Sequence, residues 1–277
     1  KAIHYFSLAA NQNHPKAQYN LGIIYSKEEY SKLDISKAIN YFSLAANQNN
    51  QEAQFQLGLI YSNGEHIKQD IDKSIYYYSL AADNNHPGAQ FQLGVIFFIG
   101  KNVAKDIDKA IHYFSLAANQ NMHEAEYFLG EIYYTTVFNR RDIDKAIHYF
   151  SLATNQNHPK AQYNLGEISH KGIHNGQDVD KSVHYFSLAA NHYHPEALFN
   201  LGSIYYRKEC NTQDISKAIY YFQLAAEQNH PEAQFELGII YFSEEYIPRD
   251  MNKVIHYFSL AANQNHPGAL YNLGFLF

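Results

Sequence analysis

A spacing of 36 residues organises the whole chain and limits the folds open to it. The same sequence motif begins at eight lysines with that spacing, which are Lys1, Lys37, Lys73, Lys109, Lys145, Lys181, Lys217 and Lys253. Seven full units and a remainder of 25 residues account for all 277 residues, with no linker or insertion between them. A fixed period of this length is typical of repeat proteins, in which each unit stacks on its neighbours. We therefore expect residues 1–277 to form a single array.

One helix of each unit, here called helix B, has sequence signals at both ends. Between Ile35 and Ala46, apolar residues cover a wide face and polar residues recur at the helical spacing i, i+4, i+7 and i+11. An Asp, which can accept hydrogen bonds from the first turn of a helix, precedes it in every complete unit: Asp34, Asp70, Asp106, Asp142, Asp178, Asp214 and Asp250. An Asn, which tolerates the left-handed conformation that closes a helix, follows it: Asn13, Asn49, Asn85, Asn121, Asn157, Asn229 and Asn265, with Tyr193 as the exception.

The other helix of each unit, here called helix A, reads A-Q-[YF]-x-L-G-x-I-[YF] in most units. A Pro, which suits the first helical position, begins it at Pro15, Pro87, Pro159, Pro195, Pro231 and Pro267. Gly22 returns in every unit, although Gly costs a helix ~1 kcal/mol relative to Ala. We expect this Gly to pack closely against the small surface of Ala9 and Ala10 in helix B. Repeated helix pairs predict an all-α solenoid.

Composition and charge argue against several classes of protein. With 46% hydrophobic residues, the chain can bury a core along its whole length. The net charge is -6, and acids and bases are mixed without a Lys/Arg run, which argues against nucleic acids and anionic membranes as partners. No apolar run approaches the ~18 residues that a membrane span needs, and Lys1 to Phe6 lack the core of a signal peptide. Cys210 is the only cysteine, so no internal disulfide forms, and a reducing, cytoplasmic compartment fits best.

The repeated phrase A-x-x-Y-F-S-L-A-A-N-Q-N-H-P-x-A-Q-[YF]-N-L-G-x-I-Y resembles the Sel-one-like repeat over the whole chain. This family is a relative of the tetratricopeptide repeat, and the resemblance implies a right-handed α-α superhelix in which helix A comes first in each repeat. The tetratricopeptide repeat itself is the alternative interpretation. It fits less well, because its unit has 34 residues and lacks the long loop between the two helices. The chain departs from the family pattern by having Asn13 and its equivalents in place of Gly. The loop glycines Gly64, Gly100 and Gly172 have no counterpart in four units.

The order of helices in the family also makes predictions about the two ends. The chain opens on a helix B and closes on a helix A, each without its partner, so we expect apolar surface at both ends and a segment of a longer protein. As a hypothesis, residues 266–277 of one copy pair with residues 1–10 of another, giving end-to-end self-association. A monomer mass that does not depend on concentration would contradict it.

Histidines recur at two places of the unit. One series, on the polar stripe of helix B, is expected to be solvated: His4, His112, His148, His184 and His256. The other, directly before helix A, is expected to satisfy a helix end: His14, His86, His158, His194, His230 and His266. Equivalent residues lie a whole repeat apart, too far to share a metal with bonds of ~2 Å.

Two further candidates for chemistry are weak. His170 and His174, near His192 and His194, have zinc-ligand spacing if their segment is helical, but Gly172 and Gly176 indicate a loop, so we expect no metal site. Ser, His and acidic residues recur at the same phase in every unit, and no glycine-rich phosphate loop is present, so we expect neither catalysis nor a cofactor. The Tyr5 series lies beside the Phe6 position and is expected in the core, not as a stacking platform for bases.

The places where the units differ are more informative about binding. On helix A the variable places lie at i, i+4, i+7 and i+11 and form one stripe. By resemblance this helix lines the concave surface, so the stripe is the candidate partner-binding groove. We call its two central rows the helix A stripe: Asn20, Ile23, Gln56, Leu59, Gln92, Val95, Phe128, Glu131, Asn164, Glu167, Asn200, Ser203, Glu236 and Ile239. Unconstrained drift on a solvated face is the alternative, but a run of exposed Ile, Leu and Val favours a peptide groove.

Two hypotheses about function follow. The first is a non-enzymatic scaffold or adaptor that binds a peptide or partner helix on its concave face by apolar contacts and Asn/Gln hydrogen bonds. The resemblance implies that such arrays assemble protein complexes. The second, also by resemblance, is a regulatory or targeting array of a larger enzyme, such as a protein kinase, whose catalytic domain lies outside this chain.

Overall fold

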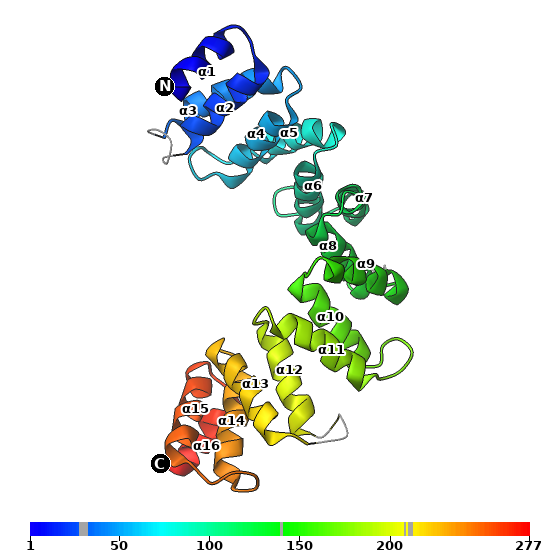
Figure 1. The fold of residues 1–277 in the computed structure, drawn as a ribbon, viewed down its shortest axis with the longest axis vertical. Coiled ribbons are helices and arrows are strands. Elements are labelled where there is room, and N and C mark those ends of the chain that lie inside the picture. The colour runs from blue at the N-terminus through cyan, green and yellow to red at the C-terminus, as the bar shows by residue number, and fades with distance from the viewer. Residues whose placement is uncertain (28–32, 139–140, 208, 210–212) are drawn as a thin grey trace. The chain divides into compact units, whose positions relative to one another are not determined.

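The chain is almost entirely helical in the computed structural model, which describes residues 1–27, 33–138, 141–207, 209 and 213–277. Those residues form sixteen α-helices and no strand (Figure 1). The odd-numbered helices are copies of helix B: α1 (Ala2–Asn11), α3 (Ile35–Ala46), α5 (Ile71–Asp83), α7 (Ile107–Ala118), α9 (Ile143–Asn155), α11 (Val179–Ala190), α13 (Ile215–Glu227) and α15 (Met251–Asn263). The even-numbered helices are copies of helix A: α2 (Pro15–Ser26), α4 (Gln51–Asn63), α6 (Pro87–Ile99), α8 (His123–Tyr134), α10 (Pro159–His170), α12 (Pro195–Tyr206), α14 (Pro231–Ser243) and α16 (Pro267–Leu276). Cys210 lies outside the described residues.

Two compact units divide the chain, residues 1–129 and residues 130–277, and helix α8 contributes to both. Within each unit the helices pack in chain order. A helix A contacts the helix B that follows it most extensively, as α2 does with α3 and α12 with α13. In the first unit, α4 also contacts α2 and α6 directly. The all-α helix-pair architecture predicted from the period is confirmed.

The predicted signals at the start of helix B are confirmed. The carboxylate of each N-terminal Asp accepts a hydrogen bond from the backbone N–H of the Lys three residues later, at 2.9 to 3.1 Å. The signal at its end is confirmed as well, because the Asn of each turn is left-handed, with φ between 59° and 64°. Tyr193 takes the same conformation, with φ 55°.

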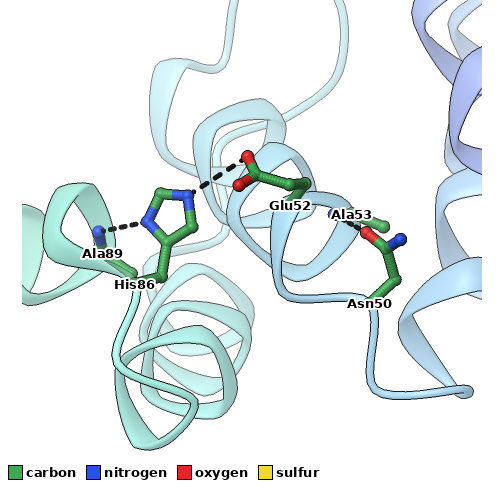
Figure 2. A network of polar contacts seen from close by, with 5 residues as sticks. All are labelled: Asn50, Glu52, Ala53, His86 and Ala89. Carbon is green, nitrogen blue, oxygen red and sulfur yellow. Dashed lines mark hydrogen bonds and ion pairs between the residues drawn. The ribbon is translucent and has the colours of Figure 1, made fainter.

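Histidine caps helix A in the way expected of the His14 series. In Figure 2, Nδ1 of His86 accepts the backbone N–H of Ala89 at 3.1 Å, and Nε2 lies 3.3 Å from a carboxylate oxygen of Glu52. Because Nδ1 accepts, the proton of the neutral ring is on Nε2, which donates to Glu52. Asn50 makes the same cap with its Oδ1, accepting from Ala53 at 2.9 Å. The other rings that cap in this way are His14, His158, His230 and His266.

The glycine that recurs at the Gly22 place of each helix A packs differently from the prediction. A Cβ atom on Gly94 would lie 2.5 Å from the ring of Phe114, in the helix B that follows. The prediction that Gly22 faces Ala9 and Ala10 is therefore wrong. The same clash, at 2.4 to 2.6 Å, would arise at Gly22 with Phe42, Gly58 with Tyr78, Gly130 with Phe150, Gly166 with Phe186, Gly202 with Phe222 and Gly238 with Phe258. These buried rings, each lying across a glycine, are the centre of the core.

A row of buried amides joins neighbouring repeats and was not predicted. Gln18 Nε2 donates to the carbonyl oxygen of Ala10 in the preceding repeat, and Gln18 Oε1 accepts at 2.7 Å from Gln48 Nε2, at the end of the following helix B. We call this pattern the amide ladder. Its other steps are Gln54 with Asn84, Gln90 with Gln120 and Gln234 with Gln264, at 2.7 to 3.3 Å.

The Tyr5 series is less buried than predicted. Tyr41 stacks on Tyr25 of the adjacent helix A, with ring centroids 5.8 Å apart and planes 6° apart, but it remains half-buried. The prediction of a core position is confirmed only in part, because rings such as Tyr41, Tyr77 and Tyr113 pack against the buried clusters but are not fully buried themselves. Apolar side chains are exposed near both chain ends, as expected: Tyr5 is 68% exposed and Phe275 is 77% exposed.

Candidate functional site

The helix A stripe lies on seven successive copies of helix A, from α2 to α14. Thirteen of its fourteen residues are half-buried, so each presents part of its side chain to solvent, and Ser203 is buried. The apolar stripe residues of the first unit, Ile23, Leu59 and Val95, are less exposed than expected. Ile23 packs against the buried cluster around Phe42 and Leu57, and Leu59 packs against the cluster around Tyr78 and Leu93. These side chains lean into the next repeat, so burial removes part of their surface from solvent.

Stripe residues of neighbouring repeats meet in the second unit. Asn164 Nδ2 donates to Glu131 Oε1, and Asn200 Nδ2 donates to Glu167 Oε1 at 3.2 Å. Each bond joins the third variable place of one repeat to the second variable place of the next. Lys171 also pairs with Glu167. The predicted acidic centre is therefore a continuous row of bonded carboxylates and amides across α8, α10 and α12.

Tyrosine hydroxyls lie close to these carboxylates. Burial raises the pKa of Tyr163, and the carboxylates of Glu167 and Glu196 raise it further. Burial also raises the pKa of Tyr134, where Lys171 acts in the opposite direction and Glu167 adds to the rise. Both phenols therefore stay neutral at physiological pH and keep a hydrogen to donate. The row thus offers donors as well as acceptors.

Glu236 differs from the other carboxylates of the stripe. Burial raises its pKa, against the opposing effects of Arg207 and His266. Its carboxylate is therefore protonated at a higher pH than that of an exposed glutamate.

Two cavities have stripe residues in their walls. One, of about 210 Å³, lies in the first unit and is lined by Gln56 and Leu59 together with Ile60 and His66. The other, of about 310 Å³, lies in the second unit and is lined by Ile239 and by aromatic side chains that include Phe258. Each is wide enough for one side chain of a bound peptide, and neither is a deep enclosed pocket.

The remaining histidines form structural or solvent contacts. All five members of the His4 series are exposed, as predicted. His170 Nε2 lies 2.7 Å from Glu209 Oε2, and His174 Nδ1 lies 3.5 Å from Asp144 Oδ1, so the two rings face different carboxylates. Helix α10 ends at His170 and Gly172 is left-handed, so the segment is a loop, as expected. Among the described residues no group of three or more His, Cys, Asp or Glu side chains is placed to hold a metal ion.

The architecture defines the class of protein. The helix pairs follow one another along the chain and are joined by glycine–aromatic contacts and by the amide ladder. This arrangement defines an α-solenoid built from 36-residue repeats. The Sel1 repeat family model matches residues 1–14, 15–50, 51–86, 87–122, 123–158, 159–194, 195–230 and 231–266. The chain belongs to the Sel1 repeat family.

Two solved structures are similar to the chain. A Sel1 repeat protein from Oxalobacter formigenes is 29% identical with a TM-score of 0.82, over 99% of this chain and 80% of that one. The protein c5321, a protective antigen of uropathogenic Escherichia coli with an SLR fold, is 25% identical with a TM-score of 0.65, over 99% of this chain and 67% of that one. No curated protein matches the chain.

The family indicates a general role. Sel1 repeats mediate protein interactions, and proteins built from them are generally non-catalytic scaffolds. In the part of the chain that the structure describes, none of the helices has the length and apolar character to cross a membrane.

Proposed function

We propose that the chain is a non-enzymatic interaction scaffold that holds a peptide or a helix of a partner protein along the helix A stripe. The observation that carries the proposal is the continuity of the stripe between repeats. Glu131 meets Asn164, and Glu167 meets Asn200, so a ligand lying across successive helices meets one row of polar groups. Such a row suits the main chain and side chains of an extended or helical segment.

The two units offer different chemistry to that ligand. In the first unit, half-buried Ile23, Leu59 and Val95 supply apolar contacts, and Gln56 and Gln92 supply amide groups. In the second unit, carboxylates and tyrosine hydroxyls dominate, which favours a segment with basic or hydroxyl side chains. The direct contacts of α4 with α2 and α6 support a continuous stripe along these three copies of helix A in the first unit.

The test begins with peptides selected from a displayed random library on the purified chain. The double variant Glu131→Gln and Glu167→Gln keeps an oxygen that can accept from Asn164 and Asn200 but removes both charges. We expect the selected basic peptides to lose about tenfold or more in affinity, measured by isothermal titration calorimetry.

The matched control removes the same number of charges from helix B. Asp144→Ser and Asp180→Ser are suitable because both residues are exposed and the equivalent places hold Ser36 and Ser216. The proposal predicts unchanged affinity for this control. Equal losses in both double variants would instead indicate general electrostatic attraction and would contradict a role for the stripe.

Two further interpretations stay predictions. One is a regulatory or targeting role within a larger enzyme, and the other is end-to-end association through residues 1–10 and 266–277. Neither has a specific contact among the described residues that favours it over the scaffold.

A further inference from the structure

The amide ladder is interrupted in the repeat of residues 159–194. Gln162 holds the place of Gln18 and is 1% exposed, and its Oε1 is buried without a hydrogen-bond partner. In the intact steps this oxygen accepts from a side-chain amide at the end of the following helix B, as Gln18 does from Gln48. Here the donor position is held by His192, whose side chain is exposed. A buried acceptor is therefore left without a donor at the place where a planar N–H group of another side chain normally lies.

The two residues that follow His192 also depart from the pattern. Tyr193 is left-handed where the other seven units have Asn, and a bulky residue in that conformation is strained. His194 makes no cap: its Nδ1 lies 3.2 Å from Glu196 and accepts no backbone N–H. Residues 192 to 194 thus lack the ladder donor, the left-handed Asn and the helix cap that other repeats have at these places. Tolerated local costs at one place are characteristic of functional surfaces.

The surroundings of this turn favour a cation that can also stack. Tyr193 is 61% exposed and presents its ring to solvent. Glu196 interacts electrostatically with both His194 and His230, while Lys160 is the cation that faces His194. The side chains of Glu196 and Glu232 are each about half exposed, so their carboxylates remain accessible.

We propose that the turn of residues 191–194, together with the unpartnered Gln162 oxygen, binds an arginine side chain carried by a partner protein. A guanidinium is planar, as is the glutamine amide that fills this place in other repeats, and it donates N–H groups in the same plane. One of them donates to Gln162 Oε1 while the flat face stacks on Tyr193 and the charge lies near Glu196. This surface shares no residue with the helix A stripe.

The experiment is a nuclear magnetic resonance titration of the full chain, labelled with ¹⁵N at glutamine, with N-acetyl-arginine methylamide as the probe. We expect a saturable shift of the Gln162 side-chain amide signal. The citrulline analogue, which has the same shape without the charge, should bind about tenfold or more weakly. A shift that never saturates, or equal shifts at many glutamines, would overturn the proposal, and so would no shift, which is the result expected if water alone fills the site.

A variant that repairs the ladder separates binding from folding. His192→Gln introduces the glutamine that other repeats have at this place, as Gln48 and Gln120. We expect this variant to have a higher melting temperature and to lose the arginine-dependent shift. Tyr193→Phe should retain binding and Tyr193→Asn should weaken it. Persistence of the shift in His192→Gln would contradict the proposal.

The stripe variant serves as an independent control. Glu131→Gln with Glu167→Gln should leave the arginine titration unchanged, because neither carboxylate belongs to this turn. Failure of the stripe proposal and failure of the turn proposal therefore give different results.

Discussion

At the scale of single residues, the helix A glycine equivalent to Gly22 is required by an aromatic ring in every copy except Gly274, and not by its own backbone conformation. Gly94 lies inside helix α6, where Ala is intrinsically better by ~1 kcal/mol. The gain from Ala is opposed by the Phe114 ring, which leaves no room for a Cβ atom. The ring is fully buried, so it has little freedom to move away.

We therefore expect Gly94→Ala to destabilise the chain by about 1 to 3 kcal/mol, the range for overpacking a core. Gly274→Ala is the matched control, since it places the same methyl group in helix α16 where nothing lies within 4 Å. That variant should be neutral or more stable. Urea unfolding of both proteins measures the difference, and a stable Gly94→Ala would show that the ring is free to shift.

Residue-scale predictions from the sequence succeeded where the interaction is local. Asp34 bonds to Lys37 and His86 bonds to Ala89, each within three residues, so residue type and position were enough. The partner of Gly22 was mispredicted because Phe42 lies in the following helix, twenty residues away, and several small or aromatic residues recur at compatible spacing. Spacing alone does not select among them.

At the scale of helices, the two kinds of helix start respond to acid in different ways. Burial lowers the pKa of His230 from 6.5, against the opposing pull of Glu232 and Glu196. The pKa of Asp106 is lowered from 3.8, chiefly because its carboxylate accepts the backbone N–H of Lys109. Folding thus favours the neutral form of His230 and the charged form of Asp106.

The chain should consequently lose stability on acidification in two windows. Between the unfolded-state pKa of 6.5 and the lower folded-state pKa of His230 and His194, the unfolded chain binds more protons, so stability falls as pH falls. The contribution of the caps Asp70, Asp106 and Asp142 is present above the unfolded-state pKa of 3.8 and is lost as pH falls through their lower folded-state pKa. Melting temperatures measured from about pH 7.5 to about pH 3 check both windows.

Asn50 supplies the control for the first window. It caps helix α4 as the histidines cap other copies of helix A, and Asn does not titrate. The variant His230→Asn should keep the cap and show a weaker pH dependence between about pH 7 and about pH 5. The same slope in both proteins would assign the dependence to other groups.

The helix scale also explains what the sequence missed in the candidate site. The stripe was identified because variation at one helical spacing is visible in the sequence alone. The hydrogen bond between Glu131 and Asn164 was not identified from the sequence. It joins residues of two different repeats, so it depends on how the repeats stack. The half-burial of Ile23 and Leu59 has the same origin, because the next repeat covers them.

At the scale of the whole molecule, the stabilising pairs fall within family repeats or between adjacent ones. The second complete repeat, residues 51–86, contains both Gly58 and Tyr78, and also both Glu52 and His86. The described helices pack on neighbours in chain order, so few contacts cross more than one repeat. Stability in such proteins is approximately a sum of repeat and interface terms.

Deletion of residues 51–86 should therefore leave a folded protein with one repeat fewer. Asn50 would then precede Pro87, and Gln90 would reach the carbonyl oxygen of Ala46 in place of that of Ala82, because each step of the amide ladder has the same form. Helical content per residue, measured by circular dichroism, should be unchanged, while the slope of urea unfolding falls by about one eighth with the lost surface. Deletion of residues 51–68 is the contrast, since it removes α4 and leaves the Tyr78 ring without its glycine. Equal loss of helix in both deletions would show that stability depends on contacts beyond adjacent repeats, because only the second deletion breaks the pairing within a repeat.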